Sequence, residues 1–390
     1  MRHDFNISTN RRGSGCVKWD CEEAHDAIPM WVADMDFRVA QPIIDALHQR
    51  VEHGVFGYTQ IPDTYYEAVI SWFNRRHGWL IQREWMLYTS GVVPALSATI
   101  KALTSPGDKV LLLTPVYNCF FSSVLNNECT IVESPLVFAD NTYHINFEDL
   151  EQKVSDPLVK VLVFCNPHNP AGRLWTAEEM TRVNNICMCN DVKVIADEIH
   201  CELVMPGYRF IPYASVSQQN LDNSITLNSP SKSFNTAGLQ IANIISNDEQ
   251  TRQRIDRALN INEVCDVNPF GVVATIAAYN QCEYWIDQLC DYLHDNYLEL
   301  KRYFALHLPQ AQVTRLEGTY LVWLDIRSFG LTSSDATRLL LEKGKVLVNS
   351  GTMYGTTAGE GFIRINIACP RQQLQEALVR ISQTLSQHTT

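Results

Sequence analysis

The sequence lacks any apolar run long enough to cross a membrane. Its longest runs, such as 110–113 and 161–165, have the length of a β-strand, whereas a membrane-spanning helix needs about 18 apolar residues or more. Residues 1–15 also lack the apolar stretch of a secretory signal. These absences predict a cytoplasmic protein without a membrane partner.

Positive charge is scarce as well. The chain has 31 Lys and Arg residues against 43 Asp and Glu residues, a formal net charge of −12, and no long basic block. Nucleic acid is therefore not expected as a partner. The 12 cysteines are scattered singly, apart from Cys187 and Cys189, and no paired CxxC motif occurs. They are typical of reduced thiols, and their spacing predicts no metal site.

What the sequence does have is an alternation of short apolar runs and longer amphipathic stretches within 90–245. Near-continuous apolar runs of this length are typical of strands buried on both faces of a mostly parallel sheet. This alternation predicts an α/β fold with helices on both faces of the sheet. The runs occupy 110–114, 161–165, 192–196, 225–228 and 241–245, and helical patterns occupy 95–103 and 177–190.

The rest of the chain predicts a smaller α+β unit. Residues 260–310 have the pattern of a long helix, and 319–325 and 362–367 have that of strands, the second with clear period-2 alternation. We therefore expect three parts: an N-terminal segment that packs with the small domain, 1–45; a large domain, 46–285; and a small C-terminal domain, 286–390.

Polar side chains follow the predicted strands directly. They are, in chain order, Tyr117, Asn169, Asp197, His200 and Lys232. In an open α/β sheet, ligands bind beyond the carboxyl ends of the strands. These five side chains are therefore expected to converge on one edge of the sheet.

This set of side chains fits an aldehyde cofactor built on a pyridine ring. A lysine whose pKa is lowered by burial can form an imine with an aldehyde, and a buried aspartate can keep a pyridine nitrogen protonated. An asparagine amide can donate to a ring hydroxyl, and a tyrosine can stack on the ring. The turn at Gly91, which leads into a helix, suits a phosphate group.

Each residue also has a simpler explanation when it is taken alone. Lys232 is typical of a solvated surface cation, and Asp197 is typical of a helix cap. Asn169, which precedes a proline, is typical of a turn, and Tyr117 suits a core or rim position. These explanations weaken because all the residues appear in order at successive strand ends.

Several motifs carry a resemblance to a known family. Residues 166–172 (NPHNPAG), 197–200 (DEIH) and 229–235 (SPSKSFN) resemble the signature blocks of fold-type I pyridoxal-phosphate (PLP) enzymes, the aspartate aminotransferase superfamily. A narrower resemblance, to the MalY/PatB group of cystathionine β-lyases or C–S lyases, covers nearly the whole chain and is carried by 12–19, 29–37, 55–59 and 361–366.

The resemblance implies a role for each candidate residue. Lys232 would be the Schiff-base lysine and would move the Cα proton of the substrate. Asp197 would face the pyridine nitrogen of PLP, Asn169 would face its hydroxyl and Tyr117 would stack on the ring, while His200 would support Asp197. The residues around the phosphate would be Gly91, Val92, Ser229 and Ser231. This last set stays open, because 234–240, where the family usually has a basic residue, contains no Lys or Arg.

Two further roles implied by the resemblance reach beyond one domain or one chain. Arg364 would bind the substrate carboxylate as a bidentate fork; its alternative role is a surface or interdomain ion pair. Tyr58 would reach the phosphate of the neighbouring subunit's cofactor, which implies a homodimer with shared active sites.

The expected function is that of a C–S β-lyase acting on a small-molecule substrate, an amino acid with sulfur on Cβ. L-Cystathionine is the default substrate, and the products would be a thiol, pyruvate and ammonia. One alternative is an aminotransferase on the same fold. Another is a regulatory protein that uses this fold to contact a transcription factor.

Overall fold

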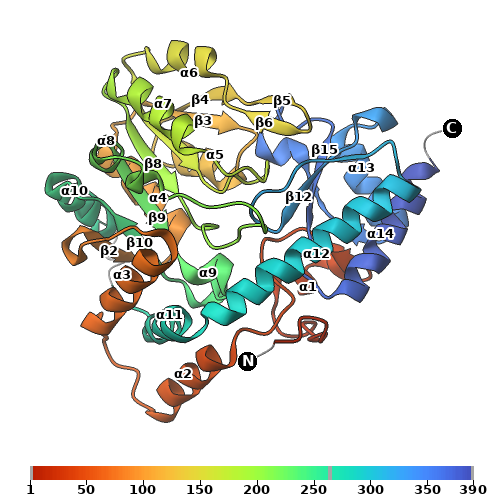
Figure 1. Cartoon of the computed structure of the whole chain (residues 1–390), viewed down its shortest axis with the longest axis horizontal. Helices are drawn as coiled ribbons and strands as arrows, with labels where there is room; N and C mark the ends of the chain where they lie inside the picture. Colours follow the sequence, from red (N-terminus) through yellow and green to blue (C-terminus); the bar gives the residue numbers. More distant parts are fainter. Residues whose placement is uncertain (1–2, 262–265, 388–390) are drawn as a thin grey trace.

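The computed structural model describes residues 3–261 and 266–387. They form a larger body around a seven-stranded sheet and a smaller body around a four-stranded sheet, and the long helix α12 (Glu283–His307) extends from one to the other (Figure 1). Every helix in these ranges is too short or too polar to cross a membrane.

The large sheet confirms the predicted mostly parallel arrangement. Its strands lie in the order β2, β10, β9, β8, β7, β3, β4, and β10 is the described strand that runs antiparallel to its neighbours. All five predicted runs are strands of this sheet. The strand bounds are β2 (Met86–Thr89), β3 (Lys109–Thr114), β4 (Thr130–Pro135), β7 (Val159–Cys165), β8 (Lys193–Asp197), β9 (Ser224–Asn228) and β10 (Ala242–Ile245).

Helices cover both faces of this sheet, as the apolar runs predict. Successive side chains of a strand point to opposite faces. Accordingly, Val110 and Leu112 join one core cluster, and Leu111 and Leu113 join another. The first cluster includes residues of α4 (Val92–Leu103), α5 (Asn118–Leu125) and α10 (Glu249–Asn260), and the second includes residues of α6 (Phe147–Val154) and α7 (Ala177–Met188). The two helical patterns predicted here are confirmed.

The smaller body contains an antiparallel sheet in the order β11, β12, β15, β14. Helix α12 packs against α14, and both contribute to the core cluster on this sheet. The bounds are β11 (Gln312–Val313), β12 (Leu321–Asp325), β14 (Asn349–Ser350), β15 (Phe362–Asn366), α13 (Ser333–Leu339) and α14 (Arg371–Ser386).

The prediction of a single long helix over 260–310 is wrong in one respect, because the described residues form two helices there. Helix α11 (Pro269–Gln281) ends at Cys282, whose backbone leaves the helical region at φ −115° and ψ 20°, and α12 follows at once. The break has a packing reason. Helix α11 packs mainly against α2 (Gln41–Glu52) and α3 (Asp63–His77), whereas α12 packs mainly against α14.

Strand β15 has the predicted alternation, yet it has no solvent-exposed face. Ile363 and Ile365 join the core cluster under the helices. Arg364 and Asn366 point the other way and are also buried, because their side chains donate to main-chain carbonyls of the N-terminal segment. The polar side chains of this strand therefore point into the interior of the molecule rather than toward solvent.

The N-terminal segment contacts both bodies. Its strand β1 (Ile28–Pro29) pairs in parallel with β13 (Val346–Leu347) near the small sheet. Further along, the Asn235 amide of the large body bonds the main chain of Met35 and Phe37. The predicted division at 45 and 285 stays a prediction.

The other α-helices among the described residues are short. They are α1 (Val17–Asp20), α8 (Gln218–Asn223) and α9 (Pro230–Ser233).

Candidate active site

A cavity of about 190 Å³ lies at the carboxyl edge of the large sheet. The N-terminal end of α4, the short helix α9 and the loops after β3, β7 and β8 contribute its walls. The structure thus brings together the five side chains expected to converge. The predicted site residues in its lining are Gly91, Val92, Tyr117, Asn169, Asp197, His200, Ser231 and Lys232.

Lys232 reaches the cavity from α9, whose turn is capped by Ser229. Its side chain is half-buried and its Nζ donates to the Ala33 carbonyl at 2.6 Å. Burial lowers the pKa of Lys232, and the carboxylates of Asp34 and Asp197 offset part of that shift. A lysine with a lowered pKa is more often the free amine, which is the nucleophilic form.

Asp197 ends β8 and is buried, with 4% of its surface exposed. Its Oδ1 accepts from the Ile199 N–H at 3.1 Å, which makes it a partial cap of the following turn, as the simpler explanation proposed. Burial raises the pKa of Asp197 to about 6, while the Ile199 N–H and the Lys232 charge act in the opposite direction. A buried carboxylate facing a cavity is suited to pair with a protonated ring nitrogen.

His200 lies beside Asp197 in the cavity wall, and its Nδ1 is buried without a hydrogen-bond partner. Its ring meets the Tyr320 ring edge-on, with the centroids 5.8 Å apart. Burial lowers the pKa of His200 well below its usual value, so the imidazole is neutral at physiological pH. The predicted role of His200, to support Asp197, stays a prediction.

The end of the cavity at α4 suits a phosphate. Helix α4 begins after Gly91, and the N–H groups of a first helical turn have no partner within the helix. Such groups bind anions. Ser231 lines this region, but Ser229 is not in the lining. The Ser229 hydroxyl instead donates to the Ile241 carbonyl at 2.5 Å and accepts from the Ser231 N–H, so its predicted phosphate contact stays a prediction.

Arg364 stands next to the cavity on β15 with 3% of its surface exposed. Its Nη1 donates to Asn169 Oδ1 at 3.1 Å and its Nη2 to the Trp31 carbonyl at 2.8 Å. The guanidinium also lies 4.7 Å from the centroid of the Tyr354 ring. Its Nε is buried without a partner, and the ion pairs found among the described residues do not include Arg364. Arg364 therefore keeps donors for a carboxylate that the protein does not supply.

The two predicted tyrosines differ in position. Tyr117 is half-buried in the cavity wall and packs edge-on against Phe120. Burial and the neighbouring Cys119 raise the pKa of Tyr117 above its usual value, so the side chain stays a neutral phenol. Tyr58 lies outside the cavity of its own chain with 98% of its surface exposed.

The sequence did not point to the Ala33 carbonyl or to Tyr320. The Tyr320 hydroxyl donates to this carbonyl at 3.0 Å, so one acceptor holds both Tyr320 and Lys232. Thr319, just before it, has φ 71°, which is rare for a β-branched residue and occurs where the surroundings enforce it. A main-chain acceptor cannot be recognised from a pattern of side chains. Tyr320 belonged to the predicted strand 319–325, and nothing in the sequence indicated a role for it in the site.

The residues present fit PLP. The cavity offers an amine with a lowered pKa at Lys232, a buried carboxylate at Asp197, an unpartnered nitrogen at His200 and a helix N-terminus at Gly91. These are groups that suit an aldehyde, a pyridinium and a phosphate. Together with the sheet, they define a fold-type I PLP enzyme.

Comparison with known proteins agrees with this class. The family model "Aminotransferase class I and II" matches residues 29–381, and the chain belongs to this family. It is 41% identical over 387 residues to the cystathionine beta-lyase PatB of Bacillus subtilis (strain 168), with 98% of this chain and 100% of PatB covered. It is 31% identical over 381 residues to the protein MalY of Escherichia coli (strain K12), with 96% and 97% covered. The predicted resemblance to the MalY/PatB group is thereby confirmed.

A solved structure extends the comparison to the fold. Cystalysin from Treponema denticola, whose crystal structure contains a pyridoxal 5'-phosphate cofactor, superimposes with a TM-score of 0.96 and 34% identity. The match covers 99% of this chain and 100% of cystalysin. The predicted fold class is confirmed.

Proposed function

We propose that the protein is a PLP-dependent C–S β-lyase that cleaves L-cystathionine or related S-substituted cysteines to a thiol, pyruvate and ammonia. The observation that carries the proposal is the position of the Lys232 amine in the cavity lining and of the Arg364 guanidinium against Asn169 of the same lining, in a chain that matches PatB over 98% of its length. An amine and a guanidinium so placed can hold an amino acid by its Cα side and by its carboxylate.

Each active-site residue has a separate role in the proposed reaction. PLP, when bound, withdraws electrons from the Cα of an amino acid joined to it, which makes the Cα proton removable. Arg364 binds the substrate carboxylate and fixes the orientation of Cα. Lys232 Nζ would hold the cofactor before the substrate arrives, take the Cα proton and pass it to the departing sulfur. Asp197 would pair with the ring nitrogen and keep it protonated, and Tyr117 would pack against the ring.

The competing aminotransferase function is distinguished by the products. With L-cystathionine as the substrate, we expect pyruvate and a thiol to form without any added keto acid. With aspartate, alanine or an aromatic amino acid plus 2-oxoglutarate, we expect glutamate to form far more slowly. Both assays use the same holoenzyme preparation. If glutamate formation dominates and cystathionine is left intact, the protein is an aminotransferase, and the assignment of PLP is unaffected.

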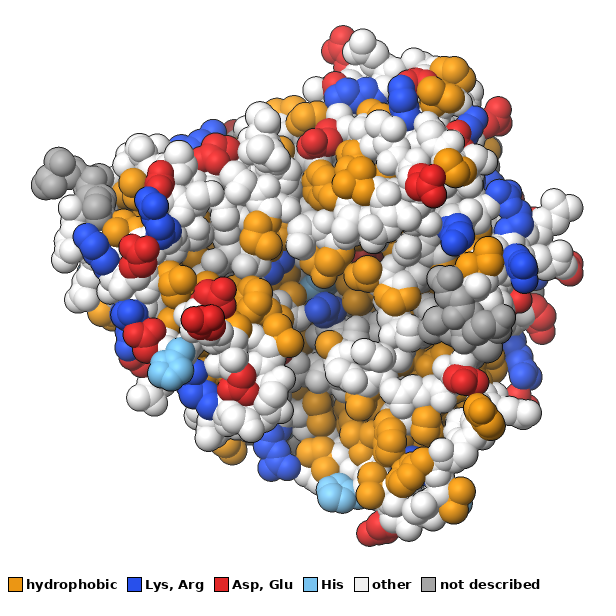
Figure 2. Space-filling view, turned by 180° about the vertical axis from the view of Figure 1, so that it is seen from behind, with side chains coloured by type: hydrophobic (Ala, Val, Ile, Leu, Met, Phe, Trp, Pro, Cys, Tyr) orange, Lys and Arg blue, Asp and Glu red, His pale blue; other side chains and the backbone are white. Residues whose placement is uncertain are grey.

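The finer proposal is that two chains share their active sites in a homodimer. Tyr58 and its neighbours form an exposed apolar stretch: Val51, Val55, Phe56 and Tyr58 are each more than half exposed. Hydrophobic side chains also gather on the lower part of the face in Figure 2, below its centre. Exposed apolar side chains in such a group are typical of a surface covered by a partner. A second copy of this chain would bring Tyr58 to the neighbouring cavity.

Mixing two inactive variants tests the shared site. Tyr58→Ala and Lys232→Ala chains, unfolded and refolded together, should regain part of the activity that each lacks alone. The reason is that one of the two sites in a mixed dimer would combine an intact Lys232 with an intact Tyr58. Pyruvate release from L-cystathionine is the measurement, and each variant refolded alone is the control. Lack of recovery in a preparation shown to contain mixed dimers would mean that each site is built from one chain.

A further inference from the structure

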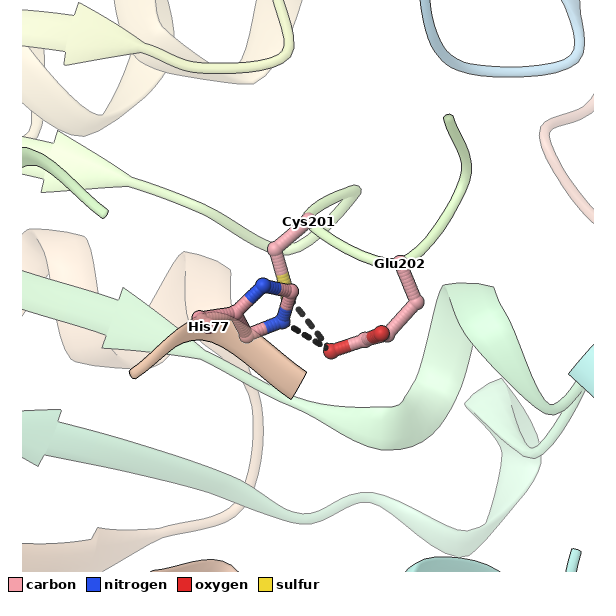
Figure 3. Close-up of side chains that lie close together, drawn as sticks. All are labelled: His77, Cys201 and Glu202. Atoms are coloured by element: carbon pink, nitrogen blue, oxygen red, sulfur yellow. Dashed lines mark hydrogen bonds and ion pairs between the residues drawn. The ribbon is translucent and has the colours of Figure 1, made fainter. Parts of the chain in front are cut away.

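A cluster of three side chains lies outside the active site, where α3 meets the loop after β8. His77 comes from the end of α3, and Cys201 and Glu202 come from the loop (Figure 3). One ligand atom from each lies within 4.8 Å of the other two. His77 Nε2 is 2.7 Å from Glu202 Oε1, and Cys201 Sγ is 3.7 Å from the same oxygen. We propose that this cluster is a binding site for one zinc ion.

The donor set is the one that zinc prefers. Imidazole nitrogen, thiolate sulfur and carboxylate oxygen are its common protein ligands, with bonds of about 2.0–2.3 Å. Two such ligands on one tetrahedral ion lie roughly 3.3–3.6 Å apart. The Cys201–Glu202 separation already fits, and the His77–Glu202 pair needs to open by roughly half an ångström. Coordination would release the thiol proton of Cys201 to solvent, and His77 would carry its ring proton on Nδ1 so that Nε2 can bind the ion.

The two carboxylate oxygens of Glu202 have different surroundings, and Oε1 is the one that faces His77 and Cys201. Its Oε1 accepts from both Trp72 Nε1 and His77 Nε2, each at 2.7 Å. Its Oε2 is buried without a hydrogen-bond partner, on a side chain with 2% of its surface exposed. The nearest charge to Oε2 is Arg76 Nε at 3.4 Å. Both His77 Nε2 and Cys201 Sγ lie near Oε1. The ion would therefore bind Oε1 in place of the His77 hydrogen bond, while Trp72 still donates to Oε1 and Oε2 stays beside Arg76.

Arg76 opposes a cation here, but it has other partners. Its guanidinium also pairs with Glu283 at 3.3 Å and with Asp287 at 2.8 Å, so it can turn from Glu202 without losing every carboxylate. The cavity of about 420 Å³ beside the cluster is lined by Glu202, by three further carboxylates and by three arginines. It has space for a water at the fourth position of the metal.

The location suggests what a bound ion would do. Cys201 and Glu202 directly follow His200 on the loop that starts from Asp197. The Cys290 thiol, which lines the same cavity, donates to the Glu202 carbonyl at 3.2 Å. An ion held by His77 as well would cross-link α3 to this loop behind the active site. The zinc would thus have a structural role, separate from the chemistry at Lys232.

Zinc stoichiometry in cysteine variants tests the proposal. Untagged holoenzyme is equilibrated with Zn²⁺, passed through a desalting column and assayed for zinc per chain. We expect about one ion in the wild type, in Cys290→Ser and in Cys189→Ser, which changes an exposed thiol. In Cys201→Ser, the zinc retained per chain should fall well below one, because the loss of one of three ligands lowers the affinity by at least about tenfold. A wild type without zinc, or a Cys201→Ser protein that retains as much zinc as the wild type, would overturn the proposal.

Two further measurements keep the test decisive if a variant folds poorly. Co²⁺ should give a thiolate-to-cobalt absorption band in the wild type, seen as a difference from the spectrum before metal addition, so that the absorption of PLP cancels. Zn²⁺ should also slow the alkylation of Cys201 in the wild-type protein, as followed by peptide mass mapping, and leave the alkylation of Cys189 unchanged. Lack of both effects would show that the cluster does not bind the metal.

Discussion

Replacing Lys232 with alanine is expected to reduce the turnover of L-cystathionine by about a thousandfold or more. General acid–base catalysis alone contributes roughly a hundredfold to ten-thousandfold, and this variant also loses the covalent attachment of PLP. The measurement is pyruvate release at saturating PLP. The matched control is Lys101→Ala, which removes an exposed lysine of α4 and should leave the rate unchanged.

Chemical labelling locates the attachment directly. Reduction of the wild-type holoenzyme with borohydride, followed by peptide mapping, should place a pyridoxyl group on the peptide that contains Lys232. The Lys232→Ala protein, with the cofactor added, should give no adduct at this peptide. An adduct on another lysine of the wild type would contradict the assignment, whatever the activity of the variant.

Asp197→Asn should retain bound PLP and lose activity by on the order of a hundredfold or more. The carboxylate is charged when it faces a protonated ring nitrogen, and an amide cannot supply that charge. The lost electrostatic stabilisation in the transition state is several kcal/mol. In the chain without cofactor, burial raises the pKa of Asp197 to about 6, and a protonated ring nitrogen beside it would lower that pKa again. The carboxyl group is therefore ionised when the comparison is made well above pH 6.

The control for this variant is Asp191→Asn, which changes an exposed aspartate at a position with φ 54°, a conformation that asparagine also adopts. The measured quantities are the rate of pyruvate release and the visible absorbance of bound PLP. Wild-type turnover in Asp197→Asn would show that the residue is only the cap of the Ile199 turn.

The strands and most of the cavity could be predicted because both depend on local patterns. A strand buried on both faces must be apolar throughout, so β3, β7 and β8 stand out in the sequence. The ends of parallel strands meet at one edge, which is enough to bring Asp197 and Lys232 together. Each of these inferences needs only a short segment and a rule of geometry.

Other features could not be predicted, since they depend on contacts between distant segments. The break at Cys282 follows from which helices pack on either side of it. The burial of Arg364 depends on carbonyls of the N-terminal segment more than 300 positions away, as the separation of 333 between Arg364 and Trp31 records. The His77 cluster joins residues that no common motif links.

The use of main-chain carbonyls to hold the two cationic residues has a consequence for how this protein can diverge. Ala33 and Trp31 hold Lys232 and Arg364 through atoms that every amino acid possesses. Point substitutions at 31 or 33 change the side chain and leave the acceptor in place. Genetic drift can therefore change the side chains at these two positions, while the free amine of the cofactor-free site and the guanidinium keep their acceptors.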